Sequence, residues 1–323
     1  MLFRSGGSVS CTPNPVPSGD SSTCTATANV GYTFSAFSGD CTGATCVLNN
    51  VTSTKSVTAN FTLNSYAITT TANPVAGGTV SCTPNPVGYG GSSTCSATAN
   101  AGYTFSAFSG DCTGATCALT NVTSTKTVTA NFTLNSYAIT TTANPVAGGS
   151  VSCTPNPVNH GSNSTCTVTA NAPYVFTSWS GGCTGTTCLL SNVTGARSVM
   201  ANFVPTLNVD GSAAATRYHP LADGLIVFRF MQGRTGTALT GGTSVAGATI
   251  TDPAAIAAYL NSLGMLLDID GNGTLDPATD ALLIMRYMLG MRGDALIANA
   301  LGTAPRARST AADIEAWLAA LMP

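Results

Sequence analysis

One loop near the C-terminus of this 323-residue chain carries the pattern of oxygen-bearing side chains that captures calcium. Asp268, Asp270 and Asn272 alternate with other residues, so their side chains stand at loop positions 1, 3 and 5. Ligands at these positions converge on one centre, while a glycine at position 6 permits the bend and position 7 offers its carbonyl. Gly273 and Thr274 occupy those last two positions. The pattern predicts a calcium site; the alternative is an acidic turn that caps a helix without metal.

Two further acidic residues complete the predicted ligand set. Asp276 stands at position 9, where a ligand acts through water, and Asp280 stands at position 13 rather than the usual 12. Pro277 favours the first position of a helix, so Asp276 is also a candidate helix cap. Asp280 then falls in the first helical turn, where a carboxylate suits both a cation and the helix dipole.

An earlier segment repeats this pattern in a weaker form. The residues that keep the ligand frame are Asn208, Asp210, Ser212 and Asp223. Ala213 to Ala215 lengthen this loop, and His219 stands where the second loop has Asp276. A lower formal charge and a longer loop both reduce the affinity for a hard dication. We therefore expect this first site to be weak or empty, and His219 to be a surface or helix-entry residue.

The cysteines belong to a three-fold repeat, since Cys82 follows Cys11 by 71 residues and Cys153 follows at the same distance. The twelve are Cys11, Cys24, Cys41, Cys46, Cys82, Cys95, Cys112, Cys117, Cys153, Cys166, Cys183 and Cys188. Four per repeat is typical of two disulfides in an oxidising compartment. Zinc binding is the alternative, but no histidine recurs with the cysteines. Of the three pairings that four cysteines allow, we favour the first with the second and the third with the fourth.

The elements that hold these cysteines have an apolar period of two. Val57, Ala59 and Phe61 face one way while Thr58 and Asn60 face the other, and the later repeats keep the alternation. This period predicts half-buried strands, with turns at the Asn-Pro-Val and Gly-Gly clusters. Each repeat also has a short aromatic cluster, which we expect in its core, with carbohydrate stacking as the alternative. Its second and third copies are Tyr103, Phe105 and Phe108, and Tyr174, Phe176 and Trp179.

These features together resemble a known family of repeats. The order Gly-Tyr-x-Phe, an aromatic before Ser-Gly-x-Cys, a second Cys and a closing Val-Thr-Ala-Asn-Phe resembles the divergent internalin B-type repeats of bacterial surface proteins, over residues 6 to 205. The resemblance implies small all-β, β-grasp-like modules in tandem on an exported protein. Phe37 and Phe108 replace the Trp usual in the family, which only Trp179 keeps, and this weakens any Trp-based binding site.

The first repeat lacks the strand-like stretch that opens the other two. The strand-like stretches at 66–71 and 137–142 have no counterpart before Gly6. We therefore expect a truncated repeat, and a chain that is the C-terminal piece of a longer exported protein. The expected organisation is a non-native stretch at 1–5, β repeats at 6–64, 65–135 and 136–205, and a helical domain at 206–323.

The helical domain is itself duplicated. The segment from Leu207 to Gly211 matches Leu267 to Gly271, and helical periodicity follows each. The tandem resembles a dockerin domain, the duplicated calcium loop and helix of secreted bacterial glycan-degrading proteins, over residues 207 to about 297. The resemblance implies an all-α, EF-hand-like fold, the ligand roles given above and a cohesin-like partner. Pro277-Ala278 and Pro220-Leu221 replace the Ser-Thr pair that dockerins present to cohesin.

Composition argues against several classes of function. The net charge is -2 and residues 1 to 205 hold seven charged side chains, so there is no basic surface for nucleic acid. No apolar run is long enough to span a membrane. The only glutamate, Glu315, and the two histidines, His160 and His219, form no catalytic motif. We expect a non-catalytic stalk with an anchoring or partner-binding tail. The alternatives are an appendage of a secreted polysaccharide-degrading hydrolase and a carbohydrate-binding module.

Overall fold

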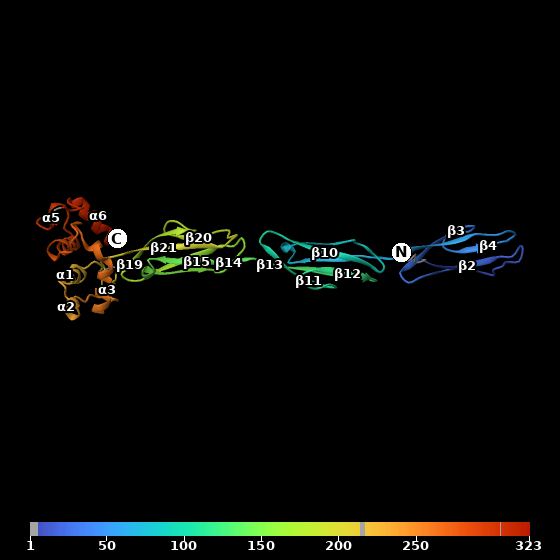
Figure 1. The fold of residues 1–323 in the computed structure, drawn as a ribbon, viewed down its shortest axis with the longest axis horizontal. Helices are drawn as coiled ribbons and strands as arrows, with labels where there is room; N and C mark the ends of the chain where they lie inside the picture. Colours follow the sequence, from blue (N-terminus) through green and yellow to red (C-terminus); the bar gives the residue numbers. More distant parts are fainter. Residues whose placement is uncertain (1–5, 214–216, 304) are drawn as a thin grey trace. The chain divides into compact units, whose positions relative to one another are not determined.

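The computed structural model describes residues 6–213, 217–303 and 305–323, in two compact units that divide after Asn135 (Figure 1). The first unit holds repeats 1 and 2, and the second holds repeat 3 and the helical domain. The stretch 1–5, expected to be non-native, lies outside the described residues, as do Ala214 and Ala215 of the expected insertion.

Repeat 2 is built from two three-stranded sheets. In spatial order, the antiparallel sheet contains β12 (Cys117–Val122), β10 (Gly91–Ala99) and β8 (Gly78–Thr83). The mixed sheet contains β11 (Tyr103–Gly110), β13 (Lys126–Leu134) and β7 (Ile68–Asn73). Its central strand β13 runs antiparallel to β11 and parallel to β7. A short ladder joins β6 (Ser65–Tyr66) to β9 (Val87–Gly88), and a 3-10 turn covers Val75–Gly77.

Repeat 3 has the same topology. Its antiparallel sheet contains β16 (Gly149–Thr154), β18 (Ser164–Ala170) and β20 (Cys188–Leu190). Its mixed sheet contains β15 (Ile139–Asn144), β21 (Arg197–Pro205) and β19 (Tyr174–Gly181). The short ladder joins β14 (Ser136–Tyr137) to β17 (Val158–Asn159), and the 3-10 turn covers Val146–Gly148. Among the described residues of both complete repeats, this turn is the only helical segment, so the modules are mostly β.

Repeat 1 has the antiparallel sheet but a smaller second sheet. The strands of its first sheet are β1 (Gly7–Thr12), β2 (Ser22–Ala28) and β4 (Cys46–Leu48). The second sheet contains β3 (Tyr32–Gly39) and β5 (Val57–Leu63). Among the described residues of this repeat, no strand stands where β7 and β15 stand in the others.

The predicted alternation places the apolar side chains of the mixed sheet in the core. Val128, Ala130 and Phe132 are 1%, 0% and 6% exposed, while Thr129 and Asn131 between them are only half-buried. The aromatic cluster joins this core, because the Phe105 ring lies 4.8 Å from Phe108 and 5.7 Å from Phe132 between centroids. Trp179 of repeat 3 is 4% exposed. The expectation that these aromatics pack in the core is confirmed.

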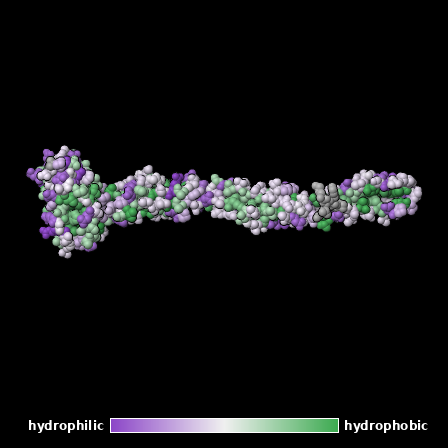
Figure 2. Space-filling model, in the orientation of Figure 1, coloured by the Kyte–Doolittle hydropathy of each residue, from purple (hydrophilic) through white to green (hydrophobic). Residues whose placement is uncertain are grey.

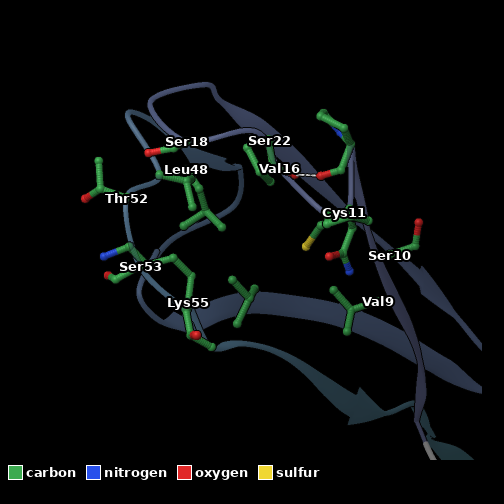
Figure 3. Close-up of a pocket in the computed structure, with 16 residues that line it drawn as sticks. Val9, Ser10, Cys11, Val16, Ser18, Ser22, Leu48, Thr52, Ser53 and Lys55 are labelled. Atoms are coloured by element: carbon green, nitrogen blue, oxygen red, sulfur yellow. Dashed lines mark hydrogen bonds between the residues drawn. The ribbon is translucent and has the colours of Figure 1, made fainter.

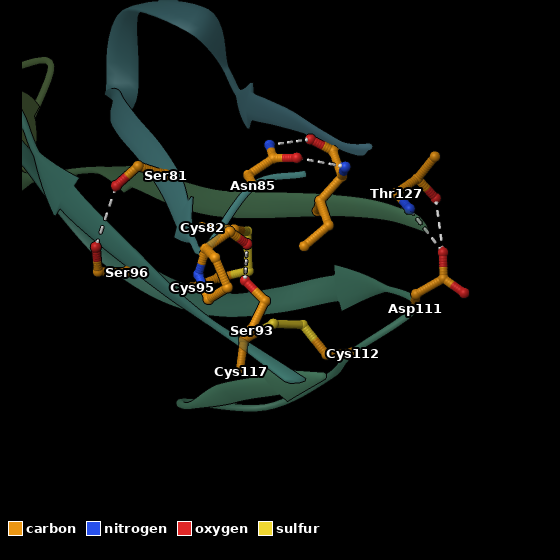
Figure 4. Close-up of a disulfide and its surroundings, with 12 residues drawn as sticks. Ser81, Cys82, Asn85, Ser93, Cys95, Ser96, Asp111, Cys112, Cys117 and Thr127 are labelled. Carbon is orange, nitrogen blue, oxygen red and sulfur yellow. Dashed lines mark hydrogen bonds between the residues drawn. A yellow bond between two sulfur atoms is a disulfide. The ribbon is translucent and has the colours of Figure 1, made fainter. Parts of the chain in front are cut away.

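All twelve cysteines form disulfides within their own repeats, in the pairing that the sequence favoured. The bonds are Cys11–Cys24, Cys41–Cys46, Cys82–Cys95, Cys112–Cys117, Cys153–Cys166 and Cys183–Cys188. In repeat 2 one bond joins facing residues of β8 and β10, and the other closes a loop against β12 (Figure 4). In the chain-entropy model, loops of these two lengths contribute about 3 and about 2 kcal/mol to stability.

The described residues of the helical domain form six α-helices. They are α1 (Leu225–Met231), α2 (Thr237–Thr240), α3 (Pro253–Leu263), α4 (Leu282–Met288), α5 (Asp294–Ile297) and α6 (Ala311–Leu321). A π-helical turn leads into α1 at Pro220–Gly224 and into α4 at Pro277–Ala281, and a 3-10 turn, Gly264–Leu267, precedes the second loop. Both halves share one core, in which Leu207 and Ile226 from the first half and Leu267 and Leu283 from the second are fully buried.

Matching contacts support the predicted duplication. Arg229 on α1 donates from Nη1 to the carbonyls of Leu239 and Gly241, at 3.2 and 2.7 Å. Arg286 on α4 donates in the same way, to two carbonyls at and after the end of α5, at 2.9 and 2.7 Å. Each arginine therefore satisfies carbonyl groups that the short following helix leaves free.

Candidate metal centre

The second loop brings three of its four predicted carboxylates to one point. Asp268, Asp270 and Asp280 each offer a ligand atom, and these atoms all lie within 4.8 Å of one another. Their side chains are 4%, 0% and 0% exposed. Leu267 and Ile269 alternate with the first two and are fully buried, so the start of the loop is anchored in the core while its carboxylates turn to one centre.

Backbone groups of the loop hold Asp268 in place. Its Oδ1 accepts hydrogen bonds from the amides of Gly271 and Asn272, at 2.8 and 3.1 Å. Its Oδ2 accepts from the amide of Gly273, at 2.9 Å. Gly273 has a positive φ of 85°, a conformation that glycine adopts without steric cost, and this explains why the bend falls there.

Asp280 joins the loop to the π-helical turn that follows it. Its Oδ1 accepts from the amide of Ile269 at 2.7 Å, and its Oδ2 accepts from the amide of Asp276 at 2.9 Å. Burial raises the pKa of the Asp280 carboxyl, and the nearby charge of Asp270 raises it further, while the backbone hydrogen bonds oppose this. Clustered buried carboxylates repel one another unless a proton or a cation neutralises them.

A segment more than thirty residues later also supports the loop. The amide of Gly302 donates to Asp270 Oδ2 at 2.6 Å. Arg308 donates from Nε to the carbonyl of Ile269 at 2.6 Å and from Nη2 to the carbonyl of Asp268 at 2.5 Å. The guanidinium carbon of Arg308 lies 3.9 Å from the ring centroid of Trp317 on α6. The sequence did not identify Gly302 or Arg308, because neither belongs to the ligand pattern.

The remaining predicted ligands lie at the outer side of the loop. Asn272 Oδ1 accepts from the amide and the hydroxyl of Thr274, at 2.9 and 2.7 Å. Asp276 is outside the group of three carboxylates; its Oδ1 accepts from the amide of Ala278 at 2.7 Å and so caps the turn that Pro277 opens. The cap role predicted for Asp276 is confirmed, and its role as a ligand through water stays a prediction.

The first loop keeps the predicted frame with fewer charges. Asn208 Oδ1 accepts from the Ser212 amide and hydroxyl, both at 3.0 Å, and the Ser212 amide also donates to Asp210 Oδ1 at 2.9 Å. Asp223 accepts from the amides of Asp210 and His219, at 3.3 and 2.8 Å. All four predicted ligand residues are therefore buried and linked by hydrogen bonds.

Burial perturbs Asp223, one of the two acids of this loop. It raises the pKa of Asp223 to about 7, with the charge of Asp210 as the second cause. Asp210 Oδ2 has no hydrogen-bond partner among the described residues, although the residue is only 3% exposed. In the second loop, the equivalent oxygen of Asp270 accepts from Gly302. Among the described residues, the first loop thus lacks a counterpart of the hydrogen bond that the Gly302 amide donates to the second loop.

His219 is the structural counterpart of Asp276. Its Nδ1 accepts from the amide of Leu221 at 3.2 Å and caps the turn that Pro220 opens. The imidazole is therefore used at the start of the helix, as the sequence led us to expect. The pair His219 and Asp276 shows that both halves begin their first helix with the same N-cap and proline arrangement.

A family model described as the divergent InlB B-repeat domain matches residues 4–65, 68–136 and 139–206. The chain belongs to this family. The three matches coincide with the three disulfide-bonded β modules and leave the helical domain unmatched. No curated protein matches the chain. InlB-type repeats and six disulfides are consistent with an extracellular protein. None of the helices in the described ranges has the length and apolar character to cross a bilayer.

Proposed function

We propose that this chain is a non-catalytic part of an exported bacterial surface protein, in which a calcium-stabilised, dockerin-like domain follows three InlB-type repeats. The domain anchors the protein or binds a partner, a cohesin-like or other surface protein. The glutamate and the two histidines each have a structural contact: Glu315 accepts from the Gly293 amide at 2.6 Å, His219 caps a helix, and the rings of His160 and Tyr137 pack together.

The cluster of Asp268, Asp270 and Asp280 is the observation that carries the calcium proposal. Calcium is a hard cation that takes six to eight oxygen ligands, and carboxylates, amide oxygens and backbone carbonyls are its usual donors in proteins. Asp268, Asp270 and Asp280, the Asn272 side chain and the Thr274 carbonyl would hold the ion, and Asp276 would act through water. The backbone hydrogen bonds to Asp268 leave its oxygens oriented before any ion arrives, which reduces the ordering that binding requires.

The first loop would contribute less to calcium binding than the second. It offers the two carboxylates of Asp210 and Asp223 with the neutral Asn208 and Ser212, and fewer charges lower the affinity for a dication. We therefore propose that calcium stabilises the domain mainly through the second loop.

The test is thermal unfolding of the full chain, followed through Trp317 in a Trp179→Phe background. Phe already occupies the equivalent position in repeats 1 and 2, and Trp317 stacks on the arginine that holds the second loop. Calcium at about a hundred times its Kd should stabilise the folded state by about 3 kcal/mol relative to chelator. Asp268→Ala should remove most of this gain, and Asp210→Ala should change it little.

The matched control is Asp294→Ala, at the start of α5 and outside both loops, which should keep the full calcium effect. An unchanged melting temperature in chelator would rule out the calcium site. A larger loss in Asp210→Ala than in Asp268→Ala would assign the ion to the first loop instead.

A further inference from the structure

The charged side chains outside the metal centre differ in what they contact. A cavity of about 640 Å³ in repeat 1 has one charged residue in its lining, Lys55, whose Nζ lies 3.4 Å from Asp40 Oδ1 (Figure 3). Most of the arginines lie in the helical domain, and hydrophilic residues are in view on this domain in Figure 2. Among the described arginines, Arg308 alone donates from its guanidinium to the backbone of the second loop.

Arg308 lies between the second loop and helix α6. Its Nε donates to the carbonyl of Ile269 at 2.6 Å, and its Nη2 donates to the carbonyl of Asp268 at 2.5 Å. Its guanidinium carbon lies 3.9 Å from the ring centroid of Trp317 on α6, within the range of cation–π attraction. Trp317 donates from Nε1 to the carbonyl of Leu266 at 3.0 Å. Helix α6 is therefore connected to the start of the loop through both side chains.

The backbone beside Arg308 bonds the next two residues of the loop. The amide of Arg308 donates to the carbonyl of Asp270 at 2.9 Å, and the amide of Ala307 donates to the carbonyl of Gly271 at 3.1 Å. The four consecutive carbonyls from Asp268 to Gly271 are thus all bonded by Ala307 and Arg308. With these carbonyls held on one side, the carboxylates of Asp268 and Asp270 are left to converge on the metal centre.

The first loop has the same backbone bond without the guanidinium. The amide of Ile250 donates to the carbonyl of Asp210 at 2.8 Å, as the amide of Arg308 does to the carbonyl of Asp270. Ile250 is therefore the structural counterpart of Arg308, and its side chain packs against the core of the domain. An isoleucine side chain has no donor for a carbonyl group. The two loops thus differ at a residue that belongs to neither predicted ligand set.

The charge of Arg308 acts on α6 rather than on the carboxylate cluster. Hydrogen bonds from Thr310 hold the pKa of the Asp313 carboxyl below its usual range, and the charge of Arg308 adds to this effect. Burial and the charge of Asp270 raise the pKa of Asp280, without a contribution from Arg308. Repulsion between the guanidinium and a bound cation should therefore be weak. The two hydrogen bonds then decide the direction of the effect when Arg308 is replaced.

We propose that Arg308 is a positioning residue for calcium binding by the second loop. This inference rests on the calcium site proposed above. By bonding the carbonyls of Asp268 and Ile269, Arg308 orders the start of the loop before an ion arrives. Binding to an ordered loop avoids part of the entropy loss that would otherwise oppose it. The affinity of the loop therefore depends on a side chain outside the ligand set, and helix α6 becomes part of the calcium-binding unit.

The experiment measures the Kd for calcium by isothermal titration calorimetry of the full chain, at a temperature where circular dichroism shows each variant folded. Arg308→Ile introduces the residue of the first half and should raise the Kd at least about tenfold, because two charge-assisted hydrogen bonds are lost. Arg308→Lys keeps the charge but cannot donate both bonds in one plane, and it should raise the Kd by a smaller factor. An unchanged or lower Kd in Arg308→Ile would overturn the proposal.

Arg292→Ile is the matched control. Arg292 also donates to two carbonyls, those of Tyr287 and Met291 at 2.9 and 2.7 Å, and its guanidinium carbon lies 3.5 Å from the Tyr287 ring centroid. These contacts lie within its own segment rather than on the second loop, so this variant should keep the Kd of the parent chain. An equal loss of affinity in Arg292→Ile and Arg308→Ile would mean that Arg308 has no specific effect on the loop.

Hydrogen exchange in chelator separates the role of Arg308 from the calcium site itself. The amides of Gly271 and Gly273 donate to the Asp268 carboxylate, so they should be protected in the parent chain without calcium. Arg308→Ile should speed their exchange at least about tenfold and leave the amides of α1 unchanged. If the parent chain binds no calcium, the calcium site is wrong, and this measurement still tests Arg308. Equal exchange in both chains would refute the positioning role.

Discussion

Single polar side chains satisfy backbone groups throughout the repeats. Ser93, which is 3% exposed, donates to the carbonyl of Pro84 at 2.8 Å, and its counterparts Ser22 and Ser164 make the same bond to Pro13 and Pro155. A buried hydroxyl without a partner costs free energy, so the proline carbonyl at a fixed position of the turn satisfies each buried serine. Small modules with few charged residues can therefore be polar in composition and still satisfied inside.

Repeats 1 and 2, but not repeat 3, contain an aspartate that accepts a hydrogen bond from a backbone amide and pairs with a lysine. Asp111 accepts from the Thr127 amide at 2.7 Å and from Lys126 Nζ at 3.1 Å. These contacts hold the pKa of the Asp111 carboxyl below its usual range, with the backbone hydrogen bond as the largest cause. Asp40 makes the equivalent contacts in repeat 1, whereas Gly182 occupies the position in repeat 3.

This difference predicts a pH dependence. A carboxyl whose pKa is lower in the folded state stabilises the fold above its unfolded pKa, and this contribution is lost as pH falls through the folded pKa. Acidification below about pH 4 should therefore weaken the Asp111 contact, since that is the ordinary range of an aspartate. Hydrogen exchange should show amide protection at Thr127 falling with acid, while Ser198 of repeat 3 serves as the internal control. Asp111→Asn should remove the difference, and equal responses at both sites would contradict it.

At the scale of elements, the sequence predicted features that depend on residues close together in the chain. The two-residue period identified the buried face of β13, and the spacing of Asp268, Asp270 and Asp280 identified the carboxylate cluster. It could not predict that β7 pairs in parallel with β13, because a period shows which face is buried and says nothing about the neighbouring strand. The support from Gly302 and Arg308 was missed for the same reason, since chain segments distant in sequence supply it.

Close packing between the 3-10 turn and the central strand of the mixed sheet explains why both complete repeats have a glycine at the end of this turn. A Cβ added at Gly148 would lie 2.6 Å from the Cβ and 2.7 Å from the Cγ of Phe203. The same approach occurs between Gly77 and Phe132. Glycine is therefore required where the 3-10 turn crosses the mixed sheet, because any side chain would displace a buried ring.

We accordingly predict that Gly148→Ala destabilises repeat 3 by about 1–3 kcal/mol, the usual cost of overpacking a core. Gly195→Ala in the same repeat is the matched control, since nothing lies within 4 Å of an added Cβ there. The measurement is thermal unfolding followed through Trp179, which lies in the core of this repeat. Equal melting temperatures for the two variants would show that the ring moves without cost.

At the scale of the whole chain, the second unit joins a β module to the helical domain through a specific contact. Repeat 3 has Pro173 where repeats 1 and 2 have Gly31 and Gly102. The Thr206 hydroxyl donates to the Pro173 carbonyl at 2.7 Å, and Thr206 is 2% exposed. Beside it, the ring of Tyr174 meets the ring of Tyr259 on α3 edge to face, with 5.8 Å between centroids. Two domains that bury such a contact are expected to unfold together.

Tyr259 carries this coupling through its hydroxyl, which accepts from the Thr206 amide at 2.8 Å and donates to the Thr206 carbonyl at 2.7 Å. Tyr259→Phe keeps the ring contact and removes both bonds, at a cost of about 1–3 kcal/mol for the buried Thr206 carbonyl left unpaired. The Thr206 amide keeps its hydrogen bond to the Pro173 carbonyl at 3.1 Å. We predict that unfolding of repeat 3, followed by Trp179, and of the helical domain, followed by Trp317, coincides in the parent chain and separates in this variant. Tyr287→Phe on α4 is the control and should leave the transitions together. Coincident transitions in Tyr259→Phe would mean that the remaining contacts couple the two domains without this hydroxyl.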